Sequence, residues 1–134
     1  MDVLVNVDVP DLDAAIEFYR RAVGLELRRR FFDGSVAELA GPSTRVFLLA
    51  KDPGSRPIPG APVSREYGRH WTPVHLDFVV PDVAVAAEQA VGAGATLEGP
   101  IQTFPWGRLA CLGDPFGHGF CLLQWRGRGY DEVA

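Results

Sequence analysis

The chain has 134 residues, enough for one compact domain or for two half-domains that share a core. Its formal net charge of −4 argues against nucleic acid or an anionic membrane as a partner, because both favour a basic surface. It has two cysteines, no signal-like segment and no apolar run approaching roughly 18 residues, so we expect a soluble protein of the reducing cytoplasm.

A short pattern occurs twice along the chain. Residues 7–12 (VDVPDL) are matched 71 positions later by residues 78–83 (FVVPDV). Each copy closes an apolar run and opens a helix-like stretch that ends at a glycine, Gly24 or Gly92, and strand-like sequence follows. We therefore expect a duplicated strand–helix–strands module, with a ligand held between the two copies.

The first module is expected over residues 1–50. Alternating apolar and polar residues over 3–9 predict a strand whose valines face a helix, with Asn6 and Asp8 on the other side. Asp11 is expected to cap a helix that runs to Val23. Three short strands should follow, over residues 25–32, 35–39 and 45–50.

The second module is expected over residues 72–126. It is preceded by residues 51–71, a proline- and glycine-rich connecting loop that is either functional or a linker, and it is followed by a tail over residues 127–134. Its predicted elements are a strand over 74–80, a helix over 82–91, a strand that begins at 96–98, and a hairpin of strands 108–112 and 119–125.

Several short motifs are distributed over the two copies. They are residues 9–13 (VPDLD), 18–19 (FY) and 24–25 (GL) in the first copy, and residues 75–82 (HLDFVVPD), 92–95 (GAGA), 106–107 (WG) and 114–117 (DPFG) in the second. In order and spacing these motifs resemble the vicinal oxygen chelate superfamily of glyoxalases, bleomycin-resistance proteins and extradiol dioxygenases. The resemblance implies an α+β fold of two βαβββ modules, which form a curled mixed sheet with a central cleft, and it implies a homodimer.

The resemblance also implies where a metal ion would bind. Metal-dependent members carry one ligand on the first and last strands of each module, and these positions fall here on Leu4, His75, Cys121 and a residue near Leu48. Leucine cannot bind a metal ion, whereas such sites need several nitrogen or oxygen ligands. No cofactor is therefore predicted, and a divalent metal is a disfavoured alternative.

Side chains that face the predicted cleft form the candidate site. His75 and Asp77 share one strand face, where they act as a binding or acid–base pair or as a hydrogen-bonded filler. An indole at Trp106 could stack on a ligand and Arg108 could bind an anionic group, although core packing competes. The full set has His75 as the candidate catalytic residue and, as ligand-binding residues, Asn6, Asp8, Asp77, Trp106, Arg108 and Cys121.

The two cysteines lie symmetrically about Phe116, so we expect them opposite each other on one sheet face. Two small buried side chains are the simpler interpretation, and a redox pair or a soft-metal site is the alternative.

The sequence favours a small-molecule-binding protein, comparable to the metal-free bleomycin-resistance branch of the superfamily. One alternative is a lyase, isomerase or dioxygenase, which would use His75 as a base or a non-standard metal site built from His75 with Glu38, Asp8 or Asp77. Another is an interaction module that pairs through its edge strands. The ligand stays open among aromatic acids, polyketide-like antibiotics and dicarbonyl metabolites.

Overall fold

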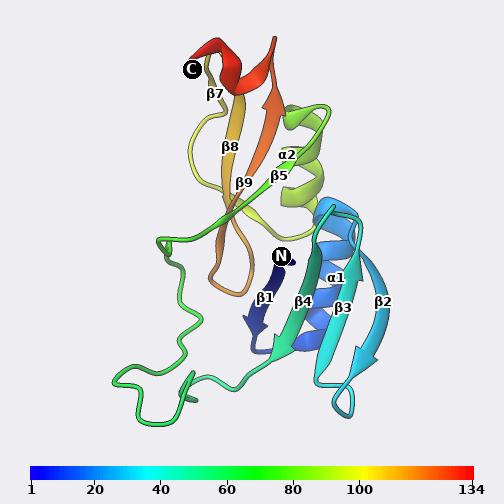
Figure 1. Cartoon of the computed structure of the whole chain (residues 1–134), viewed down its shortest axis with the longest axis vertical. Coiled ribbons are helices and arrows are strands. Elements are labelled where there is room, and N and C mark those ends of the chain that lie inside the picture. The colour runs from blue at the N-terminus through cyan, green and yellow to red at the C-terminus, as the bar shows by residue number, and fades with distance from the viewer. The chain divides into compact units, whose positions relative to one another are not determined.

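The computed structural model describes all 134 residues, which form two compact units, Met1–Gly68 and Arg69–Ala134 (Figure 1). Each unit is a mixed β-sheet with one α-helix packed on it, so the predicted α+β fold of two βαβββ modules is confirmed. The boundary between the units falls inside the predicted connecting loop, and residues 51–68 group with the first unit. Neither helix is long and apolar enough to span a membrane.

The first unit contains a four-stranded sheet. Its strands lie in the order β1 (Leu4–Val9), β4 (Arg45–Ala50), β3 (Val36–Ala40), β2 (Glu26–Phe31). The first pair is parallel and the other two pairs are antiparallel. The parallel pair is possible because α1 (Leu12–Val23), β2 and β3 separate its two strands in the chain.

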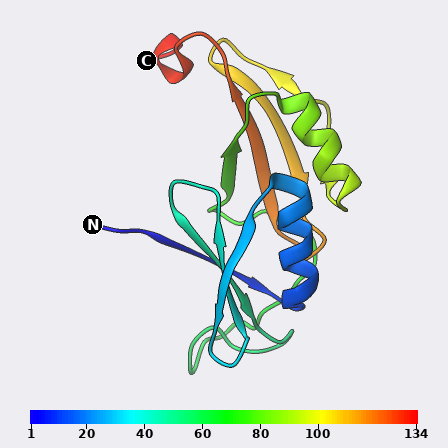
Figure 2. The same cartoon turned by 90° about the vertical axis from the view of Figure 1, so that its right-hand side faces the viewer.

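Helix α1 lies along one face of this sheet (Figure 2). The Asp11 carboxylate accepts the backbone N–H of Ala14 at 3.0 Å, which confirms the predicted cap, and Gly24 ends the helix with φ of 73°. The buried side of α1 includes Phe18, Tyr19 and Ala22, whereas Ile16 is only half-buried.

The two faces of the first sheet differ in chemistry. Leu48 and Ala37, which are neighbours in the register, are fully buried on the α1 side. Asn6 pairs in register with Phe47, and Phe47 with Glu38, so these three side chains share the opposite face. We call this second surface the α1-distal face.

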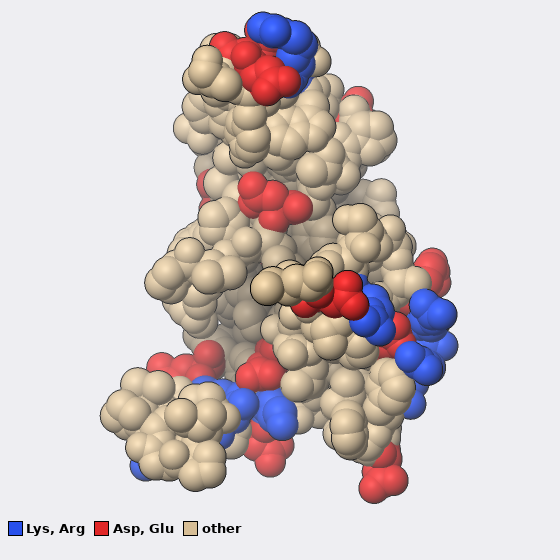
Figure 3. All heavy atoms as spheres, in the orientation of Figure 1, with Lys and Arg blue, Asp and Glu red and all other residues tan.

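Basic side chains gather on β2, the edge strand of the first sheet (Figure 3). Arg29 pairs with Glu38 at 2.6 Å, and Arg30 pairs with Asp13 of α1 at 2.5 Å. Charged side chains along an exposed edge oppose the pairing of this edge with another chain. Two of the three consecutive arginines of β2 therefore form ion pairs with acidic side chains of the same unit.

The second unit contains a sheet built around a long hairpin. Its strands lie in the order β5 (Leu76–Val79), β9 (Gly119–Trp125), β8 (Gly107–Gly113), β6 (Thr96–Leu97). The short strand β7 (Gln102–Thr103), which the sequence pattern did not predict, also pairs with β8. The pair β5–β9 is parallel, and a 3-10 helix, Gly129–Glu132, follows β9.

A carboxylate in the turn fixes the register of the β8–β9 hairpin. Asp114 Oδ1 accepts the backbone N–H groups of Phe116 and His118, both at 2.8 Å, and Asp114 Oδ2 lies 2.7 Å from His118 Nδ1. The Asp114 N–H also donates to the His118 carbonyl at 2.8 Å. Four contacts therefore determine which residues of β8 and β9 face each other.

Helix α2 (Val83–Gly92) is capped by Asp82 and joined to β9 by Gln124. The Asp82 carboxylate accepts the N–H groups of Ala84 and Val85 at 3.0 and 3.2 Å, and Gln124 Oε1 accepts that of Val83 at 3.0 Å. The Gln124 side chain therefore lies on the side of the sheet that faces α2. Residues of β9 with the opposite parity, Cys121 among them, lie on the other side, which we call the α2-distal face.

Candidate functional site

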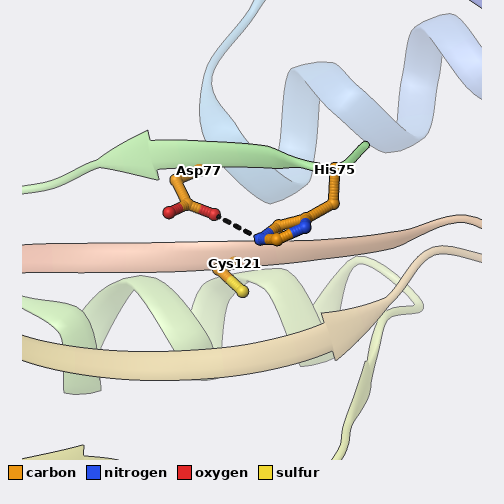
Figure 4. A group of neighbouring side chains, drawn as sticks. All are labelled: His75, Asp77 and Cys121. Carbon is orange, nitrogen blue, oxygen red and sulfur yellow. Dashed lines mark ion pairs between the residues drawn. The ribbon is translucent and has the colours of Figure 1, made fainter. Parts of the chain in front are cut away.

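The α2-distal face of the second sheet carries a cluster of three chemically active side chains (Figure 4). Asp77 of β5 is the register partner of Cys121 of β9, and His75 lies two residues before Asp77. The ligand atoms of the three residues all lie within 4.8 Å of one another, and His75 Nε2 is 3.2 Å from Asp77 Oδ1. The structure thus brings together three of the seven predicted site residues.

Exposure divides this cluster into an accessible pair and a buried thiol. The side chains of His75 and Asp77 are 41% and 36% exposed, whereas Cys121 is 3% exposed. Burial raises the pKa of the Cys121 thiol, and neighbouring Cys111 and Asp77 raise it further. Cys121 is therefore a protonated thiol at neutral pH, while the imidazole and the carboxylate can meet a ligand.

A tryptophan outside the predicted set completes this surface. The Trp71 indole meets the His75 ring edge-on, with centroids 5.4 Å apart, and is 41% exposed. Its Nε1 donates to Glu98 Oε2 at 2.7 Å, and Arg69 Nη2 donates to the same carboxylate at 2.5 Å. The Arg69 hydrogen bond is the main reason that the pKa of Glu98 is lowered, so the anchor of Trp71 is an ionised carboxylate.

Two glycines leave the space that this arrangement needs. A Cβ atom on Gly119 would lie 2.5 Å from the Trp71 ring, and one on Gly113 would lie 2.3 Å from Arg69 Nε. Trp71 and Arg69 therefore approach the backbone of the hairpin more closely than any side chain at these positions would allow. Gly113 and Gly119, on either side of the turn, were the signal in the sequence that a large side chain such as Trp71 packs against the hairpin.

Asn6 and Asp8 lie in the first unit, on the α1-distal face. Asp8 Oδ2 accepts a hydrogen bond from Arg65 Nε at 2.7 Å, and Arg65 Nη1 donates to the Arg56 carbonyl at 2.8 Å. Asp8 therefore anchors the loop that follows β4. On the same face the carboxylate of Glu38, 1% exposed, is held by Arg29, whose hydrogen bond is the largest cause of the lowered pKa of Glu38.

Arg108 and Trp106 do not join the cluster. The sequence predicts Arg108 on the ligand side, whereas its register partner is Gln124, which places it on the α2 side. Trp106 stacks on Phe104 with ring centroids 4.9 Å apart, and it packs against Tyr130 at 5.1 Å. It belongs to an aromatic cluster at the start of β8, the opposite end of the strand from the Asp114 turn.

The register also identifies the fourth metal-ligand position that the superfamily resemblance implies. Asn6 and Asp77 occupy equivalent places, 71 residues apart, and their partners are Phe47 and Cys121. The equivalent of Cys121 is therefore Phe47, which narrows the expected position near Leu48 to a single residue. A four-residue site of the superfamily type does not fit, because Leu4 and Phe47 offer no donor atom; the residues that could hold an ion are His75, Asp77 and Cys121.

Comparison with protein families identifies the class of this chain. The family model described as a glyoxalase-like domain matches residues 4–123. The chain therefore belongs to the glyoxalase-like domain family, within the vicinal oxygen chelate superfamily, which confirms the resemblance of its motifs.

Individual relatives agree with this assignment. CFP32 of Mycobacterium tuberculosis, whose name suggests a glyoxylase, is 35% identical over 123 residues; the match covers 87% of this chain and 40% of CFP32, so the chain spans about two fifths of that relative. A glyoxalase-related enzyme from Fulvimarina pelagi has the same fold, with a TM-score of 0.72 at 19% identity over 92% of this chain and 87% of that one. TnmS3, an antibiotic binding protein from Streptomyces sp. CB03234, gives a TM-score of 0.65 at 26% identity over 94% and 96% of the two chains.

The fit of Trp71 against Gly119 can be tested by filling the space between them. We expect Gly119→Ala to lower the free energy of unfolding by about 1–3 kcal/mol, the usual effect of overpacking. Denaturant unfolding followed by circular dichroism measures this change. Gly92→Ala is the matched control, because a Cβ atom there would have no neighbour within 4 Å. Equal stability of the two variants would contradict the packing of Trp71 on the hairpin.

Proposed function

We propose that the α2-distal face of the second unit binds a small organic molecule without the divalent-metal centre of the superfamily. One observation carries this proposal: two of the four metal positions hold Leu4 and Phe47, while His75 and Asp77 keep accessible polar atoms beside Trp71. Binding would then rest on aromatic contact and on hydrogen bonds, and not on coordination to an ion.

The three accessible side chains have complementary roles in such binding. The Trp71 indole offers apolar area for a planar group, and its Nε1 is already satisfied by Glu98. His75 engages Asp77 through Nε2, so its Nδ1 is the ring nitrogen that can bond to a ligand. Asp77 favours the tautomer that carries a proton on Nε2, and in that tautomer Nδ1 is a hydrogen-bond acceptor.

The comparison with TnmS3 supports a binding role. TnmS3 is an antibiotic binding protein, and its fold extends over 94% of this chain at 26% identity. A ligand with fused or conjugated rings would stack on the exposed indole of Trp71. Aromatic acids, polyketide-like antibiotics and dicarbonyl metabolites are the classes to screen first.

Catalysis is the second candidate, and the His75–Asp77 contact favours it. A carboxylate 3.2 Å from an imidazole nitrogen orients the ring, as the partner of a general base does. The name of CFP32 points in the same direction. This candidate predicts turnover of a dicarbonyl compound that His75→Ala abolishes while the circular dichroism spectrum stays unchanged. Turnover at the wild-type rate in that variant would exclude His75 as the base.

A ligand screen by thermal shift tests the binding proposal. We expect one of the three compound classes to raise the Tm of the wild-type protein, with the same shift in the presence of a chelator. Trp71→Ala should weaken binding of that compound by about tenfold, which corresponds to roughly 1.4 kcal/mol of aromatic contact.

Tyr130→Ala is the matched control, because Tyr130 is an exposed aromatic residue in the cluster around Trp106. The Tyr130→Ala variant should bind the compound with the same affinity as the wild type. Loss of binding on chelation, or equal weakening in both variants, would contradict a metal-free site beside His75.

A further inference from the structure

Cys111 and Cys121 face each other across the β8–β9 hairpin and take no direct part in the proposed ligand contacts. Their Sγ atoms lie 3.6 Å apart. Cys111 is half-buried and Cys121 is buried, and both are free thiols. The pair therefore consists of one accessible thiol and one shielded thiol in direct contact.

The backbone at this point permits a bond between the two sulfur atoms. At the turn the Asp114 N–H donates to the His118 carbonyl, and at the other end of the hairpin the Arg126 N–H donates to the Trp106 carbonyl. Hydrogen-bonded and non-hydrogen-bonded residue pairs alternate along an antiparallel hairpin. Counted from either end, Cys111 and Cys121 form a non-hydrogen-bonded pair. Cα atoms of such pairs are about 4.5 Å apart, inside the range of roughly 4.4–6.8 Å that disulfides adopt. Closing the bond thus requires mainly side-chain rotation.

We propose that Cys111 and Cys121 form a reversible thiol-modification site that reacts with a low-molecular-weight disulfide. The Cys111 thiolate attacks one sulfur of the small disulfide, which forms a mixed disulfide and releases one small thiolate. Cys121 then loses its proton and attacks Cys111 Sγ, which forms the protein disulfide and releases the second small thiolate. Each released thiolate takes up one proton, so the protein loses two electrons and two protons, and the small disulfide becomes two thiols.

The surroundings of Cys121 fit the second step. The nearest basic atoms of Asp77 and His75 lie within 4.8 Å of Cys121 Sγ and can accept its proton. Cys121 is buried and Cys111 is only half-buried, so a small disulfide reaches Cys111 first. The mixed disulfide on Cys111 is therefore the intermediate that precedes closure. In a reducing compartment the pair stays as two thiols until the concentration of small disulfides rises.

Oxidation would also alter the proposed ligand surface. Disulfide formation removes the thiol proton beside the Asp77 carboxylate, and Asp77 is the partner that orients His75. This consequence rests on the proposed function, whereas the oxidation of the two thiols does not.

Intact-mass analysis in glutathione buffers tests the site. The protein is incubated under native conditions with increasing ratios of oxidised to reduced glutathione and then alkylated. We expect the wild type to pass from two alkylated thiols to none, through a transient species that carries one glutathione. Reduced glutathione in excess should restore both thiols.

Two serine variants separate the steps. Cys121→Ser should stop at one glutathione on Cys111, and Cys111→Ser should keep its buried thiol unmodified; circular dichroism checks that both fold. Two alkylatable thiols in the wild type at every ratio, or a disulfide between two chains, would overturn the proposal. Because the readout is the thiol count, a negative ligand screen leaves this test unaffected.

Discussion

The parallel pairing of β5 with β9 is the constraint on which the chemistry of the second unit depends. It puts Asp77 beside Cys121, and the β8–β9 hairpin then puts Cys121 opposite Cys111, so that three side chains form one row across three strands. A slip of one residue in either pairing would turn members of this row towards α2. The Asp114 turn contacts and the bond between Gln124 and the start of α2 hold the hairpin and the helix in this register.

The sequence was most informative where one side of an element is buried and the other is exposed. The alternation in β1 and the paired proline–aspartate motifs predicted the two modules and both helix starts. The register of β4 could not be predicted, because residues 45–50 (RVFLLA) are apolar on both faces. That lack of alternation is why the metal-equivalent position could be given only as a residue near Leu48, which the register of β4 identifies as Phe47. Strand β8 is also apolar on both faces, because Leu109 and Cys111 alternate with Ala110 and Leu112. The sequence therefore could not show which face of the sheet Arg108 lies on.

Strand parity put His75 and Asp77 on one face from the sequence alone, and the superfamily resemblance placed Cys121 with them. Trp71 was missed because its position depends on Glu98, 27 residues away, and on the absence of a side chain at Gly119. Asp8 was taken as a ligand contact because its partner, Arg65, is 57 residues further along the chain. Contacts of this range come from tertiary packing, which local patterns do not encode. Asn6 and Asp8 belong to the first unit, whereas the accessible pair and its tryptophan belong to the second.

The central claim is that this glyoxalase-like chain presents a ligand surface in which Leu4 and Phe47 replace two of the superfamily's metal-ligand positions. Metal content per chain, measured by mass spectrometry on protein purified without a chelator or a histidine tag, tests this claim most directly. The account predicts only background iron, nickel, manganese and zinc. Near-stoichiometric metal that disappears in His75→Ala would contradict it, and would mean that His75, Asp77 and Cys121 form a metal centre of their own.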